Sequence, residues 1–215
     1  MPLRGRLVYR DRLDAGQILA RLIPRPVDPT SVVLGLPRGG VVVAAAVARA
    51  LAAPLDVLVA RKLAHPMQPE LAIGAVGPGD ALVMDWEAVD HFGLTQPQID
   101  VLVARARAEV AARLAFYRGA ARTAVDVQAR AVIVVDDGIA TGATVTAALL
   151  ALRQLDPARV MLAVPVCAPD VVPELVALVD EFVCPLTPVD FHAVGAWYED
   201  FTQVDDAEVL ALLGT

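Results

Sequence analysis

The feature that most constrains the fold is an apolar run that ends in two adjacent aspartates. Residues 132–135 read Val-Ile-Val-Val, which is typical of a parallel strand buried on both faces. Asp136 and Asp137 follow, then a loop of small and hydroxyl residues, and an alanine-rich helix is expected from about Thr144. In open α/β sheets, ligands bind beyond the carboxyl ends of strands, and a helix N-terminus offers N–H groups to phosphate. The segment therefore predicts acidic groups for a polyol or metal ion beside a phosphate cradle, which suits a sugar phosphate.

This segment resembles the 5-phosphoribosyl-1-pyrophosphate (PRPP) signature of type I phosphoribosyltransferases. In that family, two adjacent acidic residues bind the ribose hydroxyls directly or through Mg²⁺, and the following Thr-Gly loop wraps the 5′-phosphate. The resemblance implies that Asp136 and Asp137 hold the ribose and a Mg²⁺ ion. It assigns PRPP binding to Asp136, Asp137, Gly138, Ile139, Ala140, Thr141, Gly142, Ala143 and Thr144. The alternative is an ordinary strand-to-helix turn with an aspartate as the helix cap.

A second glycine loop stands between a short predicted strand and a predicted helix. Arg38, Gly39 and Gly40 form this loop. Paired glycines let backbone N–H groups approach an anion closely, and an arginine adds donors suited to phosphate oxygens. In type I phosphoribosyltransferases, the loop at this place binds pyrophosphate and often carries a strained peptide bond. The resemblance therefore assigns pyrophosphate binding to these three residues, which would otherwise be read as a simple turn.

Two basic residues, Arg61 and Lys62, end a second predicted apolar strand over residues 55–60. Adenine and orotate phosphoribosyltransferases carry a similar Arg-Lys ahead of a mobile loop that closes over the site. Here that loop is expected over residues 63–70, within a polar, proline-bearing segment. The resemblance makes Arg61 and Lys62 catalytic candidates that offset the charge of departing pyrophosphate. The alternative is a pair of long side chains at a strand end.

A general base is harder to assign. Hypoxanthine-type enzymes have an acidic residue immediately before the threonine of the PRPP loop, and this chain has Ala140 there. Adenine- and orotate-type loops also have alanine at that position. Glu70 is the catalytic candidate for this role. His65, in the predicted loop, is more simply read as exposed, with donation to pyrophosphate as the alternative.

Aromatic residues gather in the segment 190–201, beyond the last predicted strand. Such a segment could form a hood over a nucleobase. The resemblance to hypoxanthine-type enzymes, in which a Val-Gly follows an aromatic residue, makes Phe191, Val194 and Trp197 candidates for acceptor binding. The equally weighted alternative is that these aromatic side chains anchor this segment on the core.

The resemblance implies a type I phosphoribosyltransferase fold, and the order of predicted elements agrees with the parallel sheet of that fold. Of 215 residues, 57% are hydrophobic and 5% are aromatic, which suits a buried sheet covered by alanine-rich helices. The predicted strands alternate with helices and cover residues 31–36, 55–60, 131–135, 160–166 and 182–185. A hairpin is expected from 71–76 and 81–84, and a long helix over about 96–121. We expect one domain over 1–215, with a central parallel sheet flanked by helices, a core over about 31–166 and a small hood over about 185–215.

Charge and cysteine content narrow the class of protein. A formal net charge of −7 argues against nonspecific nucleic-acid binding. A basic N-terminal cluster is read as a solvated face with a minor chance of phosphate contact: Arg4, Arg6, Arg10 and Arg12. Cys167 and Cys184 lack metal-ligand spacing and are expected to be buried reduced thiols. With no signal segment or membrane span recognised, we expect a cytoplasmic protein that acts on small molecules, and the resemblance allows a homodimer.

Together these features predict an enzyme. It would transfer a 5-phosphoribosyl group from PRPP to a nucleobase-like acceptor, with Mg²⁺ bound and pyrophosphate released. The first alternative is a PRPP- or nucleotide-sensing module of the same fold without useful transfer. A weaker alternative is a phosphatase or hydrolase that uses the same phosphate cradle.

Overall fold

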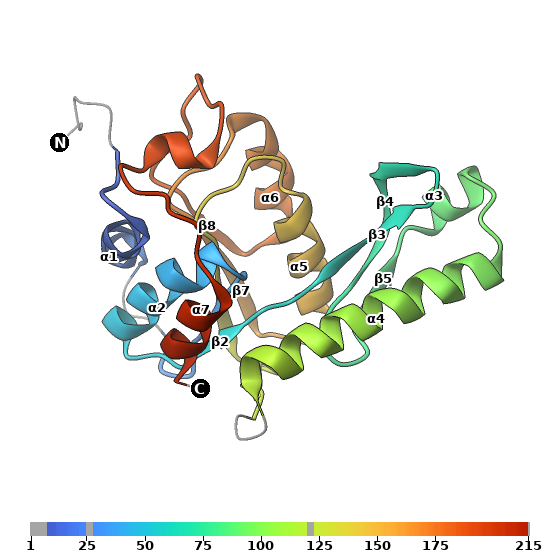
Figure 1. The fold of residues 1–215 in the computed structure, drawn as a ribbon, viewed down its shortest axis with the longest axis horizontal. Helices are drawn as coiled ribbons and strands as arrows, with labels where there is room; N and C mark the ends of the chain where they lie inside the picture. Colours follow the sequence, from blue (N-terminus) through green and yellow to red (C-terminus); the bar gives the residue numbers. More distant parts are fainter. Residues whose placement is uncertain (1–7, 25–27, 120–122, 215) are drawn as a thin grey trace.

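The computed structural model describes residues 8–24, 28–119 and 123–214. A five-stranded parallel sheet, in the order β2-β1-β6-β7-β8, forms its centre (Figure 1). These strands are β1 (Val32–Gly35), β2 (Leu55–Val57), β6 (Ala131–Val135), β7 (Arg159–Ala163) and β8 (Glu181–Val183). The predicted central parallel sheet flanked by helices is therefore confirmed.

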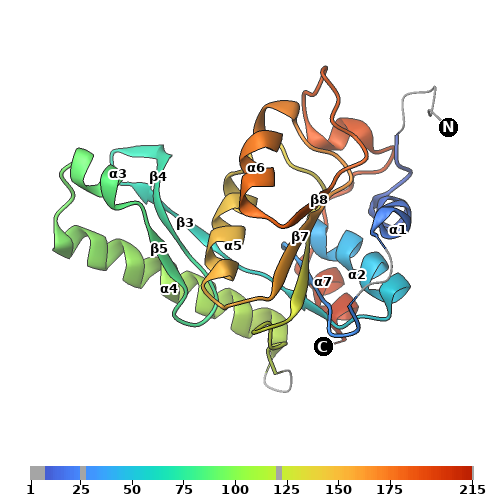
Figure 2. The same cartoon turned by 180° about the vertical axis from the view of Figure 1, so that it is seen from behind.

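The apolar run of β6 is buried on both faces. Val132 and Val134 pack in the cluster that contains α5 (Ala143–Arg153) and α6 (Val172–Leu178). Ile133 and Val135 pack in the opposite cluster, with α1 (Arg12–Leu22) and α2 (Gly39–Leu51). Figures 1 and 2 show these helix pairs on either side of the sheet. The strand lacks polar alternation because both of its faces are covered by helices.

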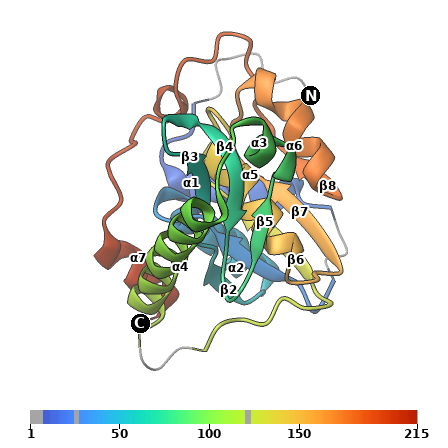
Figure 3. The same cartoon turned by 90° about the vertical axis from the view of Figure 1, so that its right-hand side faces the viewer.

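A second, antiparallel sheet forms an arm beside the core (Figure 1), and Figure 3 shows this arm in front of the core. Its strands are β3 (Arg61–His65), β4 (Gln68–Val76) and β5 (Leu82–Met84), in that order, and α3 (Trp86–His91) and α4 (Gln96–Arg118) follow. The expected hairpin is the β4–β5 pair, and the expected long helix is α4. Along one face of this sheet, α4 buries apolar residues of β3 and β4.

The prediction of a loop over residues 63–70 is wrong, because most of these residues belong to β3 and β4. Leu63 and His65 are buried on one side of β3, as alternation in a half-buried strand requires. Pro66 lies in the turn between the two strands, and the pairing shifts register between Leu63 and His65. The prolines suggested a loop, but a turn and an irregular strand end accommodate them.

The segment after β8 returns across the molecule. It contains the short 3-10 helix η2 (Val194–Trp197) and ends in α7 (Asp206–Leu213), which packs with α2 and α4. Another 3-10 turn, η1 (Pro169–Val171), precedes α6. Among the described residues, no helix is both long and apolar enough to cross a membrane.

Candidate functional site

Two loops meet at the carboxyl edge of the parallel sheet. The neighbouring strands β1 and β6 pair in register, Gly35 with Val135, so the loops that follow them start side by side. The Leu36 N–H donates to the Val135 carbonyl at 2.9 Å. The peptide bond between Pro37 and Arg38 is cis. The predicted pyrophosphate loop and the predicted ribose carboxylates therefore lie together.

Of the first loop, Gly39 and Gly40 form the start of α2, and the acidic pair requires that they carry no side chain. A Cβ atom on Gly40 would lie 2.7 Å from Asp136 Oδ1, and one on Gly39 would overlap Asp137 Oδ2. Real Cβ atoms essentially never approach another heavy atom so closely, so a side chain at either position would force a shift. The glycines are thus needed for close approach of the two loops, beyond any turn geometry.

The second loop surrounds a cavity of about 210 Å³. Its wall comprises Asp136, Gly138, Ile139, Ala140, Thr141, Gly142, Ala143, Thr144, Val145 and Val194. Gly142 has a φ of 75°, and α5 begins directly after it. The N-terminal N–H groups of this helix and the hydroxyl groups of the loop form a suitable lining for a phosphate.

Asp136 lines this cavity and is half-buried. Its Oδ1 accepts a hydrogen bond from the Asp137 N–H at 2.8 Å. Burial, and then the neighbouring charge of Asp137, raise the pKa of Asp136 well above its usual range. The pair therefore consists of two inequivalent carboxyl groups, one enclosed and one paired with a cation.

That cation is Arg12, the first residue of α1. Its Nε donates to Asp137 Oδ2 at 2.7 Å, and its Nη1 donates to the Thr202 carbonyl at 2.8 Å. Arg12 is 9% exposed, so its placement on a solvated face is wrong. Arg10 is exposed and pairs with Asp14.

The interaction of Arg12 with Asp137 joins residues 125 positions apart, and no local pattern in the sequence indicated it. Arg4 and Arg6, the other two members of the predicted basic cluster, lie outside the described residues.

The aromatic segment closes the same corner. The Tyr198 hydroxyl donates to the Asp137 carbonyl at 2.5 Å. Trp197 and Tyr198 are buried and pack with Tyr9, so they do anchor this segment. Phe191 and Val194 are half-buried at the edge of the same cluster, and Val194 closes against Gly138.

The structure thus brings Val194 to the phosphate cavity and places Trp197 in a packed cluster. Acceptor binding by Phe191, Val194 and Trp197 stays a prediction.

The two basic residues of β3 diverge. Arg61 pairs with Glu109 of α4 at 3.4 Å, whereas Lys62 lines a cavity of about 510 Å³ between the antiparallel sheet and α5. Thr141 and Ala143 border both this cavity and the phosphate cavity. Of these two basic residues, only Lys62 therefore lies beside the phosphate loop.

The remaining candidates lie farther along the arm. His65 is buried at the β3–β4 turn, where its Nδ1 accepts from the Met67 N–H at 3.2 Å and its ring lies against Phe92. The prediction that His65 is exposed is therefore wrong, and its contacts are those of a residue that stabilises a turn. Glu70 belongs to β4, and its side chain lies outside the described part of the structure.

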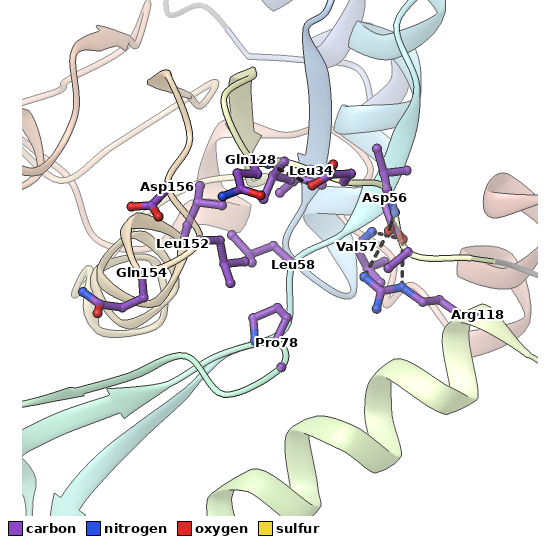
Figure 4. A pocket seen from close by; sticks show the side chains of 16 residues that line it. Leu34, Asp56, Val57, Leu58, Pro78, Arg118, Gln128, Leu152, Gln154 and Asp156 are labelled. Atoms are coloured by element: carbon purple, nitrogen blue, oxygen red, sulfur yellow. Dashed lines mark hydrogen bonds and ion pairs between the residues drawn. The ribbon is translucent and has the colours of Figure 1, made fainter.

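The largest of these cavities, about 550 Å³, lies elsewhere, between the end of β2, the segment before β6 and the end of α5. Figure 4 shows Asp56 and Arg118 joined at its side. Asp56 is fully buried and also accepts from the Val57 and Val125 N–H groups. Its polar bonds thus tie β2 to α4 and to the segment before β6.

Both cysteines are free thiols, as expected, and Cys167 is buried whereas Cys184 is half-buried. Burial raises the pKa of Cys167 to about 11 and that of Cys184 to about 12. They are therefore protonated at neutral pH.

The donor set of the site suits Mg²⁺ only in part. Carboxylate oxygens are appropriate ligands, and Asp136 and Asp137 supply them. Among the described residues, no group of three or more acidic, histidine or cysteine side chains could hold a metal ion. Mg²⁺ commonly binds through one or two carboxylates together with substrate phosphates and water. The residues therefore fit a Mg²⁺ ion that binds with a phosphorylated substrate.

Comparison with known proteins identifies the family. A family model described as the phosphoribosyl transferase domain matches residues 16–191. The chain belongs to the phosphoribosyltransferase family. Two Mycobacterium tuberculosis proteins, from different strains and both named as phosphoribosyl transferases, are 43% identical to it over 206 residues.

That match covers 96% of this chain and 46% of each relative, so the chain spans about half their length. A solved structure from Thermus thermophilus is 45% identical, with a TM-score of 0.88, covering 96% of this chain and 97% of the other. The family membership and the fold are therefore established over most of this chain.

Proposed function

We propose that this phosphoribosyltransferase transfers a 5-phosphoribosyl group from PRPP to a nucleobase-like acceptor and releases pyrophosphate. The observation that carries the proposal is the close approach of three groups at one sheet edge. The Arg38–Gly40 loop contacts the acidic pair, and the acidic pair borders the phosphate cavity. PRPP carries a diphosphate, two ribose hydroxyls and a 5′-phosphate in a matching order.

Each part of the substrate then has a binding group of suitable chemistry. The 5′-phosphate accepts hydrogen bonds from the loop of residues 140–144 and the first turn of α5. The carboxylates of Asp136 and Asp137 accept hydrogen bonds from the ribose hydroxyls. The diphosphate lies against Arg38 and the N–H groups of Gly39 and Gly40, and Lys62 adds a positive charge from the arm.

In the reaction, the bond from C1′ to the diphosphate oxygen breaks, and pyrophosphate leaves with the electron pair. A nitrogen of the acceptor forms the new bond to C1′ and loses a proton, for which Glu70 is the proposed base. Positioning and electrostatic stabilisation of the leaving group supply the catalysis. When bound, Mg²⁺ would add charge neutralisation at the diphosphate.

The acceptor would lie beside Phe191, Val194 and Trp197. We also propose that the substrates of this protein are small molecules only, that it is located in the cytoplasm and that it forms a homodimer.

A PRPP- or nucleotide-sensing module is the second candidate. The residue immediately before Thr141 favours it, because Ala140 supplies no base there and PRPP binding without transfer needs none. A sensor would bind PRPP but would release no pyrophosphate with any nucleobase.

Calorimetric titration with PRPP, with and without Mg²⁺, tests the proposal. We expect micromolar binding that is lost in the Asp136→Asn/Asp137→Asn variant. The matched control is Asp90→Asn/Asp100→Asn, which changes two exposed aspartates of the arm and should bind PRPP normally. A folded protein without PRPP affinity would contradict both candidates, and pyrophosphate release across a panel of nucleobases separates them.

A further inference from the structure

We propose that Arg12 is a positioning residue that holds the Asp137 carboxylate ready for the ribose hydroxyls of PRPP. The inference rests on the proposed function. Its basis is the contact of Arg12 Nε with Asp137 Oδ2 at 2.7 Å, in which the two side chains are 10% and 16% exposed. A charge-assisted hydrogen bond this buried fixes the direction of the carboxylate.

The guanidinium group is itself held from two other directions. Its Nη1 donates to the Thr202 carbonyl at 2.8 Å, and its central carbon lies 3.8 Å from the centroid of the Phe201 ring. Planar stacking together with forked donation is specific to arginine. The guanidinium group is therefore held in place before any ligand binds, and it holds the Asp137 carboxylate in place in turn.

The protein places Arg12 there by pairing two segments that are distant in sequence. The Tyr9 N–H donates to the Trp197 carbonyl at 2.9 Å, and the Glu199 N–H donates to the Tyr9 carbonyl at 2.8 Å. Figure 1 shows the segment before α1 running beside the segment after β8. Asp11 caps α1 through a 2.7 Å bond from the Asp14 N–H. Arg12 thus leaves the first helical turn directly beside the acidic pair.

The ion pair also touches the diphosphate loop. A Cβ atom on Gly39 would lie 2.8 Å from Arg12 Nε as well as overlapping Asp137 Oδ2. Arg12 therefore stands where the ribose and diphosphate groups of PRPP would adjoin. Two roles are chemically open at this place: positioning Asp137 for the ribose, or binding the diphosphate directly. The existing bonds of Nε and Nη1 to protein oxygens favour the positioning role.

Three probes separate these roles: PRPP, ribose 5-phosphate, which lacks the diphosphate, and inorganic phosphate, which lacks the ribose. Their dissociation constants are measured by calorimetry for Arg12→Gln, for Arg12→Lys and for wild type. Arg10→Gln is the matched control, since Arg10 is two residues away, exposed and paired with Asp14. Thermal melting of each variant shows that the fold is kept.

We expect Arg12→Gln to weaken the binding of PRPP and of ribose 5-phosphate by the same factor, about tenfold or more. Both ligands depend on the charge-assisted hydrogen bond that holds the Asp137 carboxylate toward the ribose. Inorganic phosphate should bind as before, and Arg10→Gln should change nothing. Arg12→Lys should recover part of the affinity, since it keeps the charge without the stacked fork. A loss confined to PRPP would overturn the proposal in favour of direct diphosphate binding.

A double-mutant cycle with Asp137→Asn gives the decisive readout. If Arg12 acts through Asp137, Arg12→Gln should cause no further loss of ribose 5-phosphate affinity in the Asp137→Asn background. Additive losses would overturn the proposal and indicate a general structural role. Failure of wild type to bind PRPP would instead refute the proposed function, and the positioning role with it.

Discussion

Replacing Arg118 with methionine should reveal how strongly the buried charge of Asp56 depends on its partner. Arg118 is the last residue of α4, and its Nη2 lies 3.0 Å from Asp56 Oδ2. The Asp56 side chain is only 1% exposed, so loss of the cation leaves a poorly solvated carboxylate. Methionine keeps much of the side-chain length and removes the charge.

The size of the effect follows from the partners that remain. Removing one member of a buried ion pair typically costs about 3–5 kcal/mol. The Val57 and Val125 N–H groups still bond to Asp56, and Arg118 itself is 17% exposed. We therefore expect the lower end, a loss of about 3 kcal/mol in the free energy of unfolding, which lowers Tm by about 6–12 °C for a chain of this size.

Urea unfolding of wild type, Arg118→Met and Arg105→Met measures this effect. Arg105 lies on the same helix and pairs with Glu109 at 3.0 Å, but the two side chains are 79% and 42% exposed. Its substitution should therefore change the free energy of unfolding by about 0.5 kcal/mol or less. Equal losses in the two variants, or a loss below about 1 kcal/mol for Arg118→Met, would refute the argument from burial.

Two further predictions concern the site and the thiols. Gly40→Ala places a methyl group 2.7 Å from Asp136 Oδ1, and should weaken PRPP binding in calorimetry about tenfold; unchanged affinity would show that the two loops separate easily. Cys167 and Cys184, whose pKa values are raised to about 11 and about 12, should react slowly with a disulfide reagent at pH 8, because the thiolate is the reactive form. Fast reaction in the folded protein would contradict their burial.

The sequence predicted the part of the site that is continuous along the chain. Residues 132–135 form a strand, and the loop of residues 136–144 leads into a helix, because local patterning determines both. The glycines of the first loop were also recognised locally. Their need to approach Asp136 and Asp137 follows from strand pairing, which the predicted order of elements implied.

The contacts that hold Asp137 could not be predicted in this way. Arg12 and Tyr198 approach it from 125 and 61 positions away, and neither belongs to a pattern that indicates such a contact. Arg61 and Lys62 look like one group in the sequence because they are adjacent there. Adjacent residues of a strand point to opposite faces, so only Lys62 lies beside the phosphate loop.

The pairing of the segment before α1 with the segment after β8 has a consequence for synthesis of the chain. Arg12 leaves the ribosome 190 residues before its partner Thr202. The parallel sheet is complete at Val183, before Phe201 and Thr202 have emerged. A nascent chain can thus form its strands and the phosphate loop before Phe201 and Thr202 hold Arg12 in place against Asp137. The ribose site would therefore mature after the phosphate loop.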